Sequence, residues 1–136
     1  MEAGERNAEI SVEFVEGPIS LNAIASAEYQ SEVGAIVTFH GVVRGTEQGR
    51  GLTALVYEAY QPMAAQQLKA LAVAIAAEYK LFRLEVLHST GRVKVGELSF
   101  RLVAAAAHRK EALDATSAFI EAMKMSVPIW KQIEYK

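Results

Sequence analysis

Basic side chains stand at the ends of several apolar segments, where they could bind an anion. Arg44 follows the apolar run 35–43 and directly precedes a glycine-rich stretch. Its planar guanidinium matches the oxygens of a phosphate or a carboxylate. A solvated side chain at a strand end is the alternative and is common for a single arginine. Arg44 is therefore a candidate anion ligand.

The adjacent pair His108 and Arg109 stands where a long helix is expected to begin. The first turn of a helix favours anions, because its backbone N–H groups have no partners there. Two cations at that position oppose the helix dipole unless an anion lies between them. The alternative is that His108 only caps the helix or packs against it. The pair is a second candidate anion site.

Lys124 and Lys131 lie on either side of the segment 125–130, which contains the single tryptophan, Trp130. Pro128 ends the helix between them, so their spacing does not place them on one helical face. Lys124 would complement the helix dipole in the final turn. Taken singly, each lysine is more often a solvated surface residue than a catalytic one.

Helix length separates two of these groups. His108 and Lys124 are 16 residues apart on one expected helix, which corresponds to about 24 Å along the axis. They cannot meet at one small substrate within one chain. Either they serve different sites, or a second copy of the protein brings its His108 and Arg109 to the lysines of the first, so we expect a homodimer.

Composition excludes several other chemistries. There is no cysteine, which removes thiolate catalysis, disulfides and cysteine-ligated metals. The three histidines lack a metal-binding spacing, and we expect neither a metal nor a cofactor. The net charge of −2 disfavours nucleic-acid binding. No segment predicts a signal peptide or a membrane span, so we expect a cytoplasmic protein.

The elements that would position these residues follow from hydrophobic periodicity. We expect strands at 10–16, 34–44, 52–60, 81–88 and 93–106, with a turn at 89–91 and the strand 52–60 as hairpin partner of 34–44. Helices are expected at 20–29, 62–79 and 108–125, and a short tail at 129–136. This order predicts an α+β fold, with one mostly antiparallel sheet and helices on one side. The length of 136 residues predicts a single domain, 1–136.

Five sequence blocks, in this order, resemble the large, catalytic subunit family of molybdopterin synthase. They are GAIVTFHGVVR (34–44), YEAYQPMA (57–64), LHSTGRVKVGE (87–97), AHRKEAL (107–113) and MKMSVPIWK (123–131). Together they extend from residue 34 to residue 131. The chain departs from the family's pattern at Ser89, where the residue after the histidine is often an arginine.

The resemblance implies a fold and a set of site residues. It implies an α/β hammerhead with a small β-subdomain. By correspondence with the family's motifs, catalysis would fall to Lys124 and Lys131, and substrate binding to the following residues: Val42, Val43, Arg44, His108 and Arg109. It also implies that the His-Arg pair comes from the neighbouring protomer.

The resemblance further implies partners and a reaction. Two copies would form the core of a heterotetramer, each binding a ubiquitin-like small subunit whose C-terminal Gly-Gly carries a thiocarboxylate. The expected activity is sulfur transfer from that subunit to cyclic pyranopterin monophosphate, forming molybdopterin. The alternative is a non-catalytic dimeric module that binds a phosphorylated metabolite or a protein. An assay of sulfur incorporation distinguishes the two.

Overall fold

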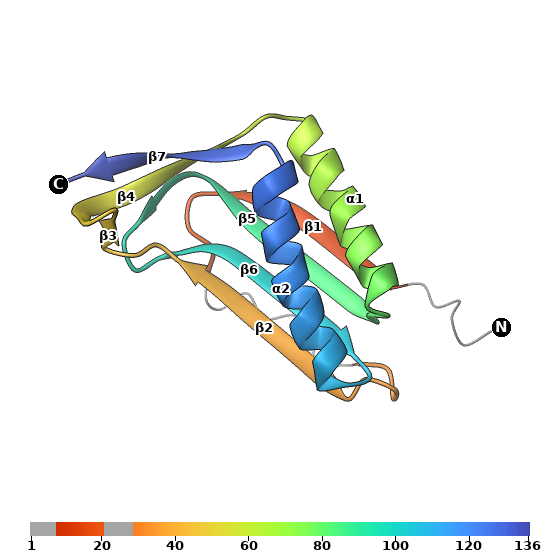
Figure 1. Ribbon diagram of the computed structural model, residues 1–136. Coiled ribbons are helices and arrows are strands. Elements are labelled where there is room, and N and C mark those ends of the chain that lie inside the picture. The colour runs from red at the N-terminus through yellow and green to blue at the C-terminus, as the bar shows by residue number, and fades with distance from the viewer. Residues whose placement is uncertain (1–7, 21–28) are drawn as a thin grey trace.

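Seven strands and two helices make up the fold in the computed structural model, which describes residues 8–20 and 29–136 (Figure 1). The elements are β1 (Glu9–Glu16), β2 (Ala35–Val42), β3 (Thr46–Glu47), β4 (Arg50–Ala59), α1 (Met63–Glu78), β5 (Arg83–Lys94), β6 (Leu98–Ala106), α2 (Arg109–Ser126) and β7 (Ile129–Tyr135). The strand expected at 10–16 and the helices expected at 62–79 and 108–125 are confirmed. The helix expected at 20–29 falls on residues 21–28, which lie outside the described part of the chain.

The strands form one sheet in the order β2-β6-β5-β4-β3, with β1 added to β5 and β7 added to β4. The β1–β5 pairing is parallel, and the other strand pairings of the described residues are antiparallel. Both helices lie side by side on one face of the sheet (Figure 1). The expected α+β fold with a mostly antiparallel sheet is therefore confirmed.

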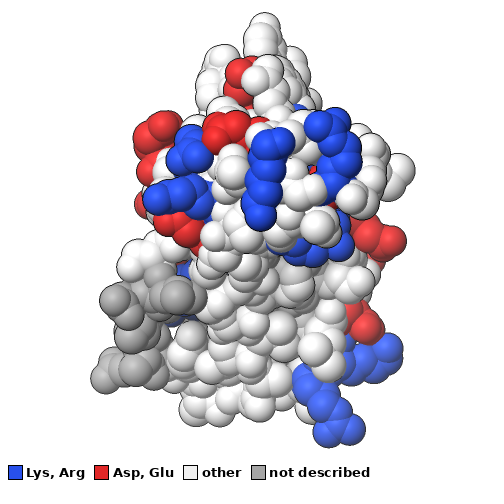
Figure 2. All heavy atoms as spheres, turned by 90° about the vertical axis from the view of Figure 1, so that its left-hand side faces the viewer, with Lys and Arg blue, Asp and Glu red and all other residues white. Residues whose placement is uncertain are grey.

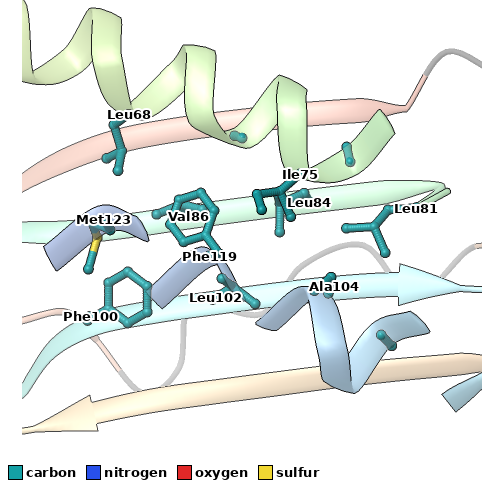
Figure 3. Packing of buried hydrophobic residues seen from close by; sticks show 14 of the residues in the cluster. Leu68, Ile75, Leu81, Leu84, Val86, Phe100, Leu102, Ala104, Phe119 and Met123 are labelled. Atoms are coloured by element: carbon teal, nitrogen blue, oxygen red, sulfur yellow. The ribbon is translucent and has the colours of Figure 1, made fainter. Parts of the chain in front are cut away.

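The main core lies between the two helices and the central strands. Figure 3 shows side chains of α1, α2, β5 and β6 meeting there, among them Leu68, Val86, Leu102 and Phe119. Alternate residues of β5 and β6 face the helices, as expected for strands with one covered face. Buried alanines in both helices leave room for close packing against this layer.

A second, smaller core lies where β3, β4 and β7 extend beyond the helices (Figure 1). It consists of Val43, Leu52, Leu55 and Val93, with Tyr57 and Ile133 packed against them. This part of the sheet is the small β-subdomain that the family resemblance implies, and it positions the chain segments that follow β2 and α2.

The predicted strand pairing was wrong in one place. β4 does not form a hairpin with β2, because β2 pairs with β6, whereas β4 pairs with β3, β5 and β7. Hydrophobic alternation shows that a strand has a buried face, but it does not show which strand lies beside it.

Two element boundaries were also wrong. Residues 89–91 are not a turn, because β5 continues through them to Lys94, with Gly91 at a φ of 79°. The reversal occurs at residues 95–97, where Gly96 has a φ of 89°. The tail 129–136 is the strand β7, paired with β4 over most of its length.

No helix within residues 8–20 and 29–136 combines the length and the apolar character that crossing a bilayer would require.

Candidate active site

A cavity of about 620 Å³ lies between the C-terminal end of α2, the start of β7 and the sheet. Its wall is mainly apolar, with side chains such as Phe39 of β2, Phe100 of β6, Met123 of α2 and Ile129 of β7, and β4 and β5 also contribute to it. This volume is in the range of small-molecule sites, which are typically apolar with a few polar groups.

Both predicted catalytic lysines line this cavity. Lys124 lies in the last turn of α2 and Lys131 in β7, opposite Tyr57 of β4. The chain leaves the helix at Val127 and Pro128 and returns as a strand, which turns both side chains toward the same space. Both residues are exposed in the single chain.

The three substrate-binding residues predicted at the end of β2 take different positions. Val42 lines the cavity and is 50% exposed. Val43 lies instead in the smaller core at 3% exposure, and its backbone N–H and C=O are bonded to Glu97 and Gly96. The Val43 side chain therefore packs in the smaller core and does not line the cavity.

Arg44 is linked to the cavity through a carboxylate that sequence analysis missed. A guanidinium nitrogen of Arg44 lies 3.9 Å from Glu47 Oε2, and Lys131 Nζ lies 3.3 Å from Glu47 Oε1. Glu47 thus holds the predicted substrate-binding residue Arg44 near the predicted catalytic residue Lys131. Glu47 falls in the glycine-rich stretch 45–51, whose composition predicts a loop. That prediction was wrong, because the stretch forms the short strand β3 paired with the start of β4, and the sequence offered no signal for this contact.

His108 and Arg109 lie at the opposite end of α2 from Lys124 (Figure 1). His108 is the N-terminal cap residue of the helix, and its Nδ1 lies 3.0 Å from Glu111 Oε1. Arg109 is exposed. Within one chain, His108 and Arg109 therefore do not reach the cavity. The structure confirms the predicted separation of His108 from Lys124 by the length of the helix.

His88 is a cavity residue that sequence analysis did not assign. It lies in β5 at 5% exposure, and its Nδ1 is 2.7 Å from the carbonyl oxygen of Ser89. Burial lowers the pKa of His88 below its ordinary value of 6.5, and the hydrogen bond to Ser89 opposes this only in part. The imidazole is therefore neutral at pH 7.

Charged side chains gather at the end of the molecule where β3, β4 and β7 lie. Figure 2 shows Lys and Arg interspersed with Asp and Glu over the upper part of this face, above a broad area with neither. The cations there include Arg44 and Lys131, both near Glu47. Within the described ranges, no three potential metal-ligating side chains (His, Asp or Glu) cluster together. Lys124 and Lys131 could bind an anion or transfer a proton at the cavity.

The family model described as MoaE protein matches residues 14–126 of this chain. A protein of Arabidopsis thaliana named molybdopterin synthase catalytic subunit is 34% identical over 137 residues, which covers 99% of this chain and 68% of that protein. Molybdopterin synthase catalytic subunit 1 of Mycobacterium tuberculosis is 37% identical over 115 residues, 85% of this chain and 78% of that one. This chain spans only 53% of the length of two rice relatives of the same name, which are 43% identical over 102 residues, or 75% of this chain.

Two solved structures share the fold. Molybdopterin synthase from Staphylococcus aureus has a TM-score of 0.78 and 29% identity, covering 95% of this chain and 91% of that one. A complex of subunits 1 and 2 of molybdopterin-converting factor from Helicobacter pylori has a chain with a TM-score of 0.69 and 27% identity, covering 91% of this chain and 88% of that one.

Proposed function

Because this chain belongs to the MoaE protein family, we propose that it is the catalytic subunit of a molybdopterin synthase. Its reaction is sulfur transfer in molybdenum cofactor biosynthesis: a thiocarboxylated small subunit is the sulfur donor, and cyclic pyranopterin monophosphate is the acceptor. The observation that supports this best is the convergence of Lys124 and Lys131, from two different elements, on one mostly apolar cavity.

Cations at this cavity address the main difficulty of the reaction. Both reactants are anions, a phosphate ester and a thiocarboxylate, and they repel each other. Charge-assisted hydrogen bonds from Lys131 and Arg44 would offset that repulsion. The apolar wall formed by side chains such as Phe100 and Met123 lowers the local dielectric constant, which strengthens these electrostatic contacts.

The two lysines would have different tasks. Lys124, at the end of a helix beside the cavity, is placed to move protons during the reaction. Lys131, in the first half of β7, is placed to orient the C-terminal tail of the small subunit. It would also stabilise the negative charge of the tetrahedral intermediate that forms when water adds to the acyl carbon, before the C–S bond breaks and the sulfur leaves its carrier.

The assembly supplies what a single chain lacks. His108 and Arg109 lie a helix length from Lys124, so we propose that they serve the cavity of a second copy in a homodimer. Each copy would also bind one ubiquitin-like small subunit through its C-terminal Gly-Gly. The Helicobacter pylori complex of subunits 1 and 2 supports such a pairing.

Sulfur incorporation into cyclic pyranopterin monophosphate tests the proposal. Lys124→Ala is expected to lower turnover about 10²- to 10⁴-fold, the usual contribution of a positioned proton-transfer group, while the protein stays dimeric by light scattering. Lys69→Ala is the matched control, because Lys69 is an exposed lysine on α1 that bonds to the carbonyl oxygen of Ile10. Near-normal turnover in Lys124→Ala would contradict the assignment. A wild-type protein that binds the pterin without transferring sulfur would favour a non-catalytic binding module.

A further inference from the structure

His88 is the most enclosed titratable side chain of the cavity wall. It lies opposite Phe14 of β1 and Phe100 of β6 in the sheet. Three aromatic rings surround the imidazole, with centroid distances of 5.9 Å to Phe14, 5.3 Å to Tyr57 and 5.9 Å to Phe100. These contacts hold the ring in the wall of the cavity that Lys124 and Lys131 also line.

The hydrogen bond of His88 determines its tautomer. Its Nδ1 lies 2.7 Å from the carbonyl oxygen of Ser89, and a carbonyl oxygen can only accept. Nδ1 therefore carries the proton and donates. In a neutral imidazole the other nitrogen, Nε2, is then an acceptor with a free lone pair.

The neighbouring polar groups do not use this acceptor. The Tyr57 hydroxyl donates to Ser99 Oγ at 3.0 Å, so it does not donate to the imidazole. Within residues 8–20 and 29–136, the structure shows a hydrogen bond of His88 Nδ1 to Ser89 and none of Nε2. His88 lines the cavity, so Nε2 is the ring nitrogen left to bind a molecule there.

From this geometry we infer that His88 is a positioning residue whose Nε2 accepts a hydrogen bond from an N–H group of a bound reactant. His88 can have this role only if the proposed function holds, because that function supplies the reactants. The donors meant here are the N3–H of the pterin ring and the backbone amides of the two terminal glycines of the incoming tail. A single fixed acceptor in a mainly apolar wall would orient either one relative to the lysines, which is the usual role of isolated polar groups in such sites.

The test removes the N–H and the acceptor separately. In one arm, small subunits ending in Gly-Gly are compared with ones that carry sarcosine at either of the last two positions. In the other arm, 6-hydroxymethylpterin monophosphate is compared with its 3-N-methyl derivative. Dissociation constants are measured by calorimetry for the wild type, His88→Phe and His88→Gln. His88→Met is a second variant without an acceptor, should the phenylalanine not be accommodated.

N-methylation is expected to weaken binding to the wild type about tenfold in one of the two arms, since a buried acceptor is left unpaired. The same change should have no effect on His88→Phe or His88→Met, while His88→Gln, which keeps an acceptor, should retain part of the penalty. The arm that shows this pattern identifies the reactant. Equal penalties in the wild type and the Phe and Met variants, or no penalty in either arm, would overturn the inference even if the wild type transfers sulfur. A wild type that transfers no sulfur would instead overturn the proposed function.

Discussion

Glu47 is the only partner that the described residues show for Arg44 and for the Lys131 ammonium. An anionic reactant that binds these cations must therefore compete with a carboxylate of the protein itself. We predict that Glu47→Gln, which keeps the size of the side chain and removes its charge, increases the affinity for anionic reactants.

The size of the effect follows from the two contacts. Exposed ion pairs are worth about 0.2–1 kcal/mol each. The Arg44 pair is long, at 3.9 Å, and the Arg44 side chain is 79% exposed, so it belongs at the lower end of that range. The Lys131 pair is shorter, at 3.3 Å, with side-chain exposures of 44% and 21%, so it belongs nearer the upper end. Releasing Arg44 and Lys131 from their ion pairs with Glu47 corresponds to a gain of about threefold to tenfold in the affinity for an anionic reactant.

Calorimetric titration of cyclic pyranopterin monophosphate into the wild type and Glu47→Gln measures this gain directly. Glu13→Gln is the control, because it removes an equal charge from an exposed position on β1. The gain should shrink as salt is raised, since these cations are partly solvated. An unchanged or weaker affinity in Glu47→Gln would refute the idea that Glu47 competes with the substrate.

Three further predictions concern stability. Burial lowers the pKa of His88 below 6.5, so this side chain takes up a proton less readily in the folded state than in the unfolded state. The free energy of unfolding should therefore fall as the pH drops below about 6.5. Urea titrations at several pH values should show a smaller dependence in His88→Phe. Phe119 is fully buried between the helices and the sheet, so Phe119→Ala should cost about 3–5 kcal/mol, and a loss below about 1 kcal/mol would contradict this packing. A Cβ on Gly34 would meet the carbonyl oxygen of Ala107, so Gly34→Ala should lower the free energy of unfolding by about 1–3 kcal/mol. It should also disturb the neighbouring His108. Thermal unfolding measures the first effect, and a sulfur-transfer assay measures the second.

Local sequence patterns predicted the elements well. The helical periodicity between Leu68 and Ile75 and the alternation between Ile10 and Phe14 correspond to α1 and β1, since a local period reflects which face is buried. The blocks around Arg44, His108, Lys124 and Lys131 also indicated the family. Helix length by itself separated His108 from Lys124, because a helix has a fixed rise per residue.

Only the tertiary structure decided which elements are neighbours. Strand pairing and side-chain direction are set by contacts between residues distant in sequence, and a local pattern does not contain them. The tail that the sequence leaves unassigned is a strand because β4 offers it an edge, and that pairing helps place Lys131 beside Lys124 at one cavity. The same long-range packing buries Val43, brings Glu47 to Lys131 and encloses His88 in aromatic rings.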